Sequence, residues 1–188
     1  MFTLDEFIAA FDIADVNPNP ARFDQKKAES INGDHIRMLE ASDFAARLVP
    51  YLATADLVEN PPTADQQTIL DAAAPLVQER MQLLGEAPGL LGFLFRDEVV
   101  YDDDALKSLP ENSGPVLVAS VGALELVPEQ GFTAAAVQSE LQKALIDDLG
   151  LKPRVAYGPL RVAISGRRVS PPLFESMELL GRDKSLAR

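Results

Sequence analysis

The C-terminal stretch of this sequence, residues 150–188, has the side chains best suited to binding an anion. It has eight basic and three acidic side chains, a net charge of +5, whereas residues 1–149 have nine basic and 26 acidic side chains, a net charge of −17. One basic region on an acidic chain is typical of a contact surface for an anionic partner. Apolar residues are interleaved with these charges, which disfavours the alternative of a solvated charged tail. The basic side chains are Lys152, Arg154, Arg161, Arg167, Arg168, Arg182, Lys184 and Arg188.

The same stretch predicts a defined local shape. Ser170 and Pro171 are the residue types expected at the N-cap and the first position of a helix, and the apolar residues of 173–180 have helical spacing. Arg167 and Arg168 precede that helix, whose first turn offers free backbone N–H groups and a positive dipole end. Arginines leading into a helix N-terminus predict a phosphate-binding corner. From the residues alone, nucleic-acid binding competes with a surface of salt-bridged charges.

Two runs of the sequence, joined by a third, resemble one known family. The run LRVAISGRRVSPPLFESMELLGRDKSLAR resembles the closing segment of bacterial glutamyl-tRNA synthetases, with its LR-x-A, P-x-LF and LLG-(R/K)-(D/E) elements. The run ARFDQKKAESINGDHIRML resembles the region that follows the catalytic domain of that family, and PLVQERMQLLGEAPGLLGFLF lies between the two. The runs follow the order of the family, and the resemblance is strongest to its actinobacterial-type members.

The resemblance implies roles for individual residues at a single-stranded RNA loop, whose bases are read by stacking and by hydrogen bonds to their edges. The residues that match the base-contacting pattern of the family are Arg161, Ser170, Pro171 and Leu173. The expected phosphate contacts, which position the loop without reading it, are Lys152, Arg154, Arg167 and Arg168. Serine stands where some members have threonine, and Pro172 where others have glycine. The alternatives are a surface ion pair for Arg161 and a simple helix cap for Ser170.

Gly92 suggests a hypothesis about specificity. In members that charge only glutamate tRNA, an arginine at what looks like this position inspects an anticodon base. Glycine would remove the side chain that rejects the glutamine-type anticodon. We therefore expect the intact enzyme to be non-discriminating and to accept both the glutamate and the glutamine tRNA. The alternative is that glycine here permits a close contact between helices.

The sequence offers no catalytic or metal-binding constellation. His35 is the only histidine and there is no cysteine, so neither a typical zinc site nor a Ser-His-Asp triad is expected. We expect Asp102–Asp104 to cap a helix and face its positive end rather than to bind a metal. The HIGH-type and KMSKS-type motifs of the family and a glycine-rich phosphate loop are absent. We therefore expect this chain to be the C-terminal part of such a synthetase and to catalyse no ATP–pyrophosphate exchange by itself. On this resemblance, the catalytic domain uses the ATP and Mg²⁺.

The periodicity predicts an all-α fold: an N-terminal helical stalk over residues 1–45, a helical cage over 46–112 and a second helical bundle over 113–188. The run VLVASVGALELV is ambiguous between strand and helix, and the resemblance favours helix. No apolar run approaches the roughly 20 residues of a membrane span. The absence of a signal-peptide pattern and of cysteines predicts the cytoplasm. The expected partner is tRNA, with no DNA and no membrane, and the expected state is a monomer.

Residue types also predict where individual helices begin and end. The expected N-caps are Thr3, Asp24, Ser42, Thr63 and Thr133. A stop is expected at Asn32–Gly33, followed by a new helix from Asp34, and a kink or break at Pro75. The expected core residues near the N-terminus are Phe23, Ile31 and Ile36.

Two other functions stay open from the sequence. One is a helical protein-interaction module that presents the acidic residues between Asp97 and Asp104 to a basic partner. The other is a helical DNA-binding regulator, for which the sequence contains no convincing helix-turn-helix.

Overall fold

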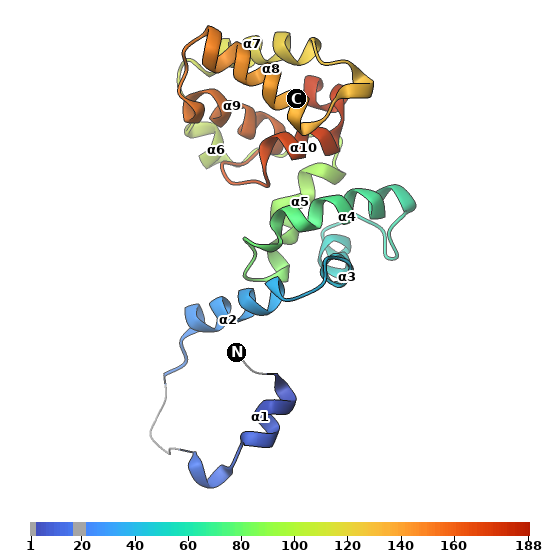
Figure 1. The fold of residues 1–188 in the computed structure, drawn as a ribbon, viewed down its shortest axis with the longest axis vertical. Coiled ribbons are helices and arrows are strands. Elements are labelled where there is room, and N and C mark those ends of the chain that lie inside the picture. The colour runs from blue at the N-terminus through green and yellow to red at the C-terminus, as the bar shows by residue number, and fades with distance from the viewer. Residues whose placement is uncertain (1–2, 17–21) are drawn as a thin grey trace.

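The structure, a computed structural model, describes residues 3–16 and 22–188. These residues form eleven α-helices and no strand, so the predicted all-α class is confirmed. Figure 1 shows an elongated chain in which the N-terminal helices, a middle bundle and a C-terminal bundle follow one another. Short 3₁₀ segments η1 (Ile13–Asp15), η2 (Leu84–Glu86) and η3 (Glu129–Gly131) connect some of the helices.

The N-terminal helices are α1 (Leu4–Ala10) and α2 (Gln25–Arg37). Both predicted caps are confirmed: Thr3 and Glu6 form a capping box, and the Asp24 carboxylate accepts a hydrogen bond of 3.1 Å from the Lys27 N–H. These side chains satisfy backbone N–H groups that have no partner inside the helix.

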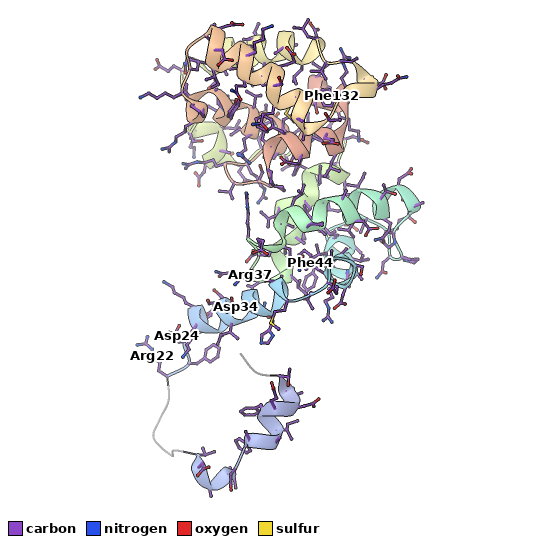
Figure 2. The ribbon with its side chains drawn as sticks, in the orientation of Figure 1. Arg22, Asp24, Asp34, Arg37, Phe44 and Phe132 are labelled. Carbon is purple, nitrogen blue, oxygen red and sulfur yellow. The ribbon has the colours of Figure 1, made fainter. Side chains whose placement is uncertain are left out.

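The predicted break at Gly33 is wrong, because α2 continues through it to Arg37. Gly33 is buried, and a Cβ there would lie 3.3 Å from the Met81 carbonyl oxygen, so the glycine permits close packing rather than a helix stop. Of the three residues predicted to lie in the core, Ile36 is buried, with 4% of its surface exposed. The prediction is wrong for Phe23, which is 79% exposed, and for Ile31, which is 45% exposed. Figure 2 shows Asp34 and Arg37 at the end of α2 that meets the middle bundle.

The middle bundle consists of α3 (Ala41–Thr54), α4 (Ala64–Gln78) and α5 (Ala87–Phe95). Apolar side chains spaced along these helices form its core, including Phe44 (Figure 2), Leu52 and Leu91. The cap at Thr63 is confirmed, whereas the N-cap position of α3 is Glu40 rather than Ser42, and the Glu40 side chain accepts no capping hydrogen bond. Pro75 lies inside α4 without dividing it.

The C-terminal bundle contains the remaining helices. They are α6 (Asp103–Lys107), α7 (Ser113–Glu125), α8 (Ala134–Leu141), the π-helical turn η4 (Gln142–Asp148), α9 (Pro153–Ser165), α10 (Leu173–Leu180) and α11 (Arg182–Ala187). The ambiguous run is helical, as α7, and the Thr133 cap is confirmed.

Several contacts join the bundles, and two of them lie at the end of α9. The Arg188 guanidinium donates to the carbonyl oxygens of Phe93 at 2.9 Å and Arg96 at 2.8 Å, at the end of α5, and to that of Ile164 at 2.8 Å, in the last turn of α9. The Asp102 N–H donates to the Gly166 carbonyl oxygen at 2.9 Å, so the chain reaches the C-terminal bundle before α6 begins. The division at residues 45/46 and 112/113 stays a prediction.

Candidate nucleic-acid interface

Helix α9 and the loop that follows it position the predicted base-contacting arginine. Pro153 opens α9 at a position where a proline costs no hydrogen bond, and Gly166 ends it with a left-handed φ of 74°. The loop then turns back along the helix, and Arg161 Nη1 donates to the Ser170 hydroxyl at 2.7 Å, the Pro171 carbonyl at 2.8 Å and the Ser170 carbonyl at 3.3 Å. Arg161 therefore fixes the position of the loop.

The environment of Arg161 is electrostatically unusual. Burial lowers the pKa of its guanidinium from the ordinary value, and the nearby positive charge of Arg80 lowers it further. Burial reduces the solvation of the positive charge, and Arg80 adds repulsion from a like charge. The attraction of an anion bound at this guanidinium would offset both penalties.

An open groove of about 610 Å³ lies along α9 and contains three of the predicted RNA-binding arginines. These are Arg154 and Arg161 on the helix and Arg168 in the loop, and no carboxylate lines the groove. Arg154 and Arg168 are exposed, and neither forms an ion pair within the part of the chain that the structure describes. On a chain with a net charge of −12, a groove of this composition favours an anionic ligand.

Tyr157 adds an aromatic ring to the groove, and the sequence analysis missed it. Its ring packs edge-on against Phe174, with the ring centroids 5.3 Å apart, so its orientation is fixed. Burial raises the pKa of its hydroxyl, and Asp147 raises it further. Arg154, Tyr157 and Arg161 are spaced by three and then four residues, which places them on one face of a helix. That spacing is visible in the sequence and could have identified Tyr157.

The loop residues predicted to contact bases lie largely inside the protein. Ser170 is 3% exposed and its hydroxyl donates to the Pro171 carbonyl oxygen at 3.1 Å, while Leu173 is 5% exposed and packs in the core. Pro171 is buried as well. In this arrangement Pro171 and Leu173 therefore present little surface to a base, contrary to the base-contacting role that the resemblance implies. Val169, which is 69% exposed at the loop tip, is the apolar side chain that the loop presents to solvent.

The predicted cap at Ser170 is also wrong, by two residues. Helix α10 begins at Leu173, and its N-cap is Pro172, which has an extended ψ of 133°. The two consecutive prolines keep the chain extended up to this point because a residue before proline avoids the helical region. Ser170 instead connects the loop to Arg161.

Arg167 and Lys152 lie outside the groove. The Nη2 atom of Arg167 is 3.6 Å from an Asp102 carboxylate oxygen. Its Nη1 atom faces the middle bundle, 3.0 Å from where a Cβ of Gly89 in α5 would be. Asp102 is the N-cap residue of α6, but its side chain accepts no capping hydrogen bond. Lys152 is exposed just before α9. Phosphate contacts by Arg167 and Lys152 stay predictions.

Gly92 does not face this surface. It is buried in α5, and a Cβ there would lie 3.2 Å from Leu57 Cδ1. An arginine at this position would direct its side chain into the core of the middle bundle instead of toward a ligand. The structure shows a close contact at Gly92, with Leu57 in the segment that follows α3. The specificity role of this position stays a prediction.

The described residues contain neither a metal-binding cluster nor a membrane-spanning helix. Within residues 3–16 and 22–188 no three acidic, histidine or cysteine side chains are grouped so that they could hold a metal ion. None of the helices in these ranges combines the length and the apolar composition that crossing a membrane requires.

The sequence and the fold match known proteins. Residues 43–188 match the family described as anticodon binding domain. The whole chain is 62% identical to the glutamate–tRNA ligase of Leifsonia xyli subsp. xyli and covers 39% of it. It is 57% identical to that of Kocuria rhizophila and covers 37% of it. A crystal structure of a glutamate tRNA ligase from Elizabethkingia meningosepticum shares the fold, with a TM-score of 0.75 and 20% identity over 99% of this chain and 35% of that one. The chain thus spans less than two fifths of the length of these relatives.

Proposed function

This chain belongs to the anticodon binding domain family, and we propose that it recognises the anticodon loop of a tRNA as the C-terminal part of a glutamate–tRNA ligase. The observation that carries the proposal is the groove along α9, which combines three arginines and a tyrosine and has no carboxylate in its lining. Single-stranded RNA is bound by this combination of cationic side chains and aromatic surface.

The groove residues divide between two tasks. The exposed guanidiniums of Arg154 and Arg168 contact backbone phosphates, which position the RNA without reading its sequence. The ring of Tyr157 in the groove, and the exposed side chain of Val169 next to Arg168 in the loop, offer apolar surface against which unpaired bases stack. Arg161 holds the loop in place through Nη1 and directs its remaining N–H groups to a base edge or a phosphate.

Glutamate tRNA is the proposed partner, and a monomer is the proposed binding unit. With Gly92 buried against Leu57, acceptance of glutamine tRNA has no structural support from that residue. The ATP and Mg²⁺ used in aminoacylation belong, on this proposal, to a catalytic domain. The 62% identity to a glutamate–tRNA ligase supports this assignment.

The acidic residues between Asp97 and Asp104 give less support to a protein-interaction module. The Asp97 carboxylate accepts a hydrogen bond of 3.1 Å from Lys184 Nζ, and Asp102 pairs with Arg167 at 3.6 Å. Two of the acids are therefore already neutralised by basic residues of the same chain. The arginines in the groove have no such partners in the described ranges.

The proposal is tested by titrating a labelled RNA hairpin that has the anticodon loop of glutamate tRNA. Three phosphate contacts in the groove predict a slope of about −2 for log K against log salt, so binding should weaken about 20-fold between about 50 and about 200 mM KCl. A hairpin with the same stem and a scrambled loop should bind at least about tenfold more weakly. Binding that is independent of salt, or equal for both loops, would contradict the proposal. A third hairpin with the glutamine anticodon decides whether both tRNAs are accepted.

A further inference from the structure

Two arginines from different bundles meet at one carbonyl oxygen. Arg80 follows α4 in the middle bundle, and its Nη1 donates to the Ser170 carbonyl oxygen at 3.1 Å. Arg161 of α9 donates to the same oxygen at 3.3 Å. The two positively charged groups are therefore held close together at the junction between the bundles.

Neither guanidinium has a carboxylate partner among the residues that the structure describes. Other arginines of the chain do: Arg47 pairs with Asp43 at 3.0 Å, and Arg167 with Asp102 at 3.6 Å. Two like charges near one another, with only neutral carbonyl and hydroxyl acceptors, repel each other. The pKa of Arg161 is lowered first by burial and then by Arg80, as this arrangement requires.

Both side chains keep donors for a ligand. A guanidinium has five N–H donors, and the hydrogen bonds of Arg80 and Arg161 within the described residues use only Nη1 of each. The one buried side-chain nitrogen or oxygen without a hydrogen bond in those residues is Nε of Arg188. The unused N–H groups of Arg161 are therefore accessible to solvent, and Arg80 is exposed.

We infer that Arg80 and Arg161 together form a phosphate subsite that spans the two bundles and takes one backbone phosphodiester of the bound RNA. The inference rests on the proposed function. A phosphate matches the planar donor fork of two arginines, and its negative charge removes their mutual repulsion. The bound RNA would thereby contact the middle bundle as well as the C-terminal bundle and hold their relative arrangement.

The test replaces Arg80 with glutamine in the whole chain and titrates the glutamate anticodon hairpin over a range of salt. Arg80→Gln should weaken binding about tenfold at about 50 mM KCl and reduce the salt slope by about 0.7, the value of one phosphate contact on a single strand. Arg47→Gln is the matched control, because it removes the same charge from the same bundle but from a side chain that Asp43 already pairs. It should leave both the affinity and the slope close to those of the wild type.

A second measurement needs no variant. In ¹⁵N NMR spectra of the wild type, the hairpin should shift the Nε–H resonances of Arg80 and Arg161 together, whereas inorganic phosphate at the same ionic strength should shift them only at millimolar concentrations. Equal losses for Arg80→Gln and Arg47→Gln would overturn the inference and leave the proposed function intact. So would a weaker affinity with an unchanged slope, because Arg80 would then act only by holding Ser170. A wild type that binds no hairpin at all would overturn the proposed function itself.

Discussion

Replacing Gly166 with alanine is expected to lower the free energy of unfolding by about 3 to 4 kcal/mol, the largest effect of any single substitution considered for this chain. A Cβ at this position would lie 2.1 Å from the Val100 carbonyl oxygen, which is part of the backbone and cannot rotate away. The residue also has a φ of 74°, a conformation that costs an L-residue about 1 kcal/mol or more. The chain near Val100 would have to move away from the end of α9.

Urea denaturation of the two proteins measures this difference. Gly150→Ala is the matched control, since Gly150 has a similar φ of 64° but a Cβ there would meet no atom within 4 Å. It should cost only about 1 kcal/mol, the conformational part of the penalty. Equal losses for the two variants would show that the close approach of the Val100 carbonyl adds nothing to the conformational penalty, and would contradict the prediction.

Replacing Arg161 with alanine is expected to have the largest effect on RNA binding, about a 100-fold loss of affinity for the anticodon hairpin. The substitution removes a positive charge from the groove and the three hydrogen bonds to Ser170 and Pro171 that fix the loop. Arg168 lies in that loop and lines the groove, so its position would be lost as well.

The control for this prediction is Arg154→Ala. Arg154 lines the same groove, but it is exposed and forms no ion pair within the described residues. The substitution should remove about one phosphate contact and lower the affinity for the hairpin about fivefold at low salt. Fluorescence anisotropy gives both affinities, and circular dichroism shows whether each variant is folded. If the two variants lost affinity to the same extent, the loop geometry set by Arg161 would play no part in binding.

The helical class and the caps at Thr3, Asp24 and Thr63 were predictable because they depend on residues close together in the sequence. The groove was predictable in part, since Arg154, Arg161 and Arg168 belong to one basic stretch. The face shared by Arg154, Tyr157 and Arg161 was predictable too, from their spacing by three and four residues, although the sequence analysis did not use it.

The contacts that were not predicted join residues that are distant in the sequence. Gly33 continues its helix because it packs against Met81, and Gly92 is buried because it packs against Leu57. Neither partner can be identified from composition or spacing. The same holds for Arg80, which reaches a carbonyl oxygen 90 positions further along the chain.

The most direct test of the account is to locate the RNA on the protein. A photoreactive 4-thiouridine placed in the loop of the glutamate anticodon hairpin forms a covalent bond with a side chain in contact, and mass spectrometry of the digested complex identifies the peptide. The groove predicts cross-links to the segment that contains Tyr157 and to the one that contains Arg168 and Val169. Cross-links confined to the acidic segment between Asp97 and Asp104, or to α1, would contradict it.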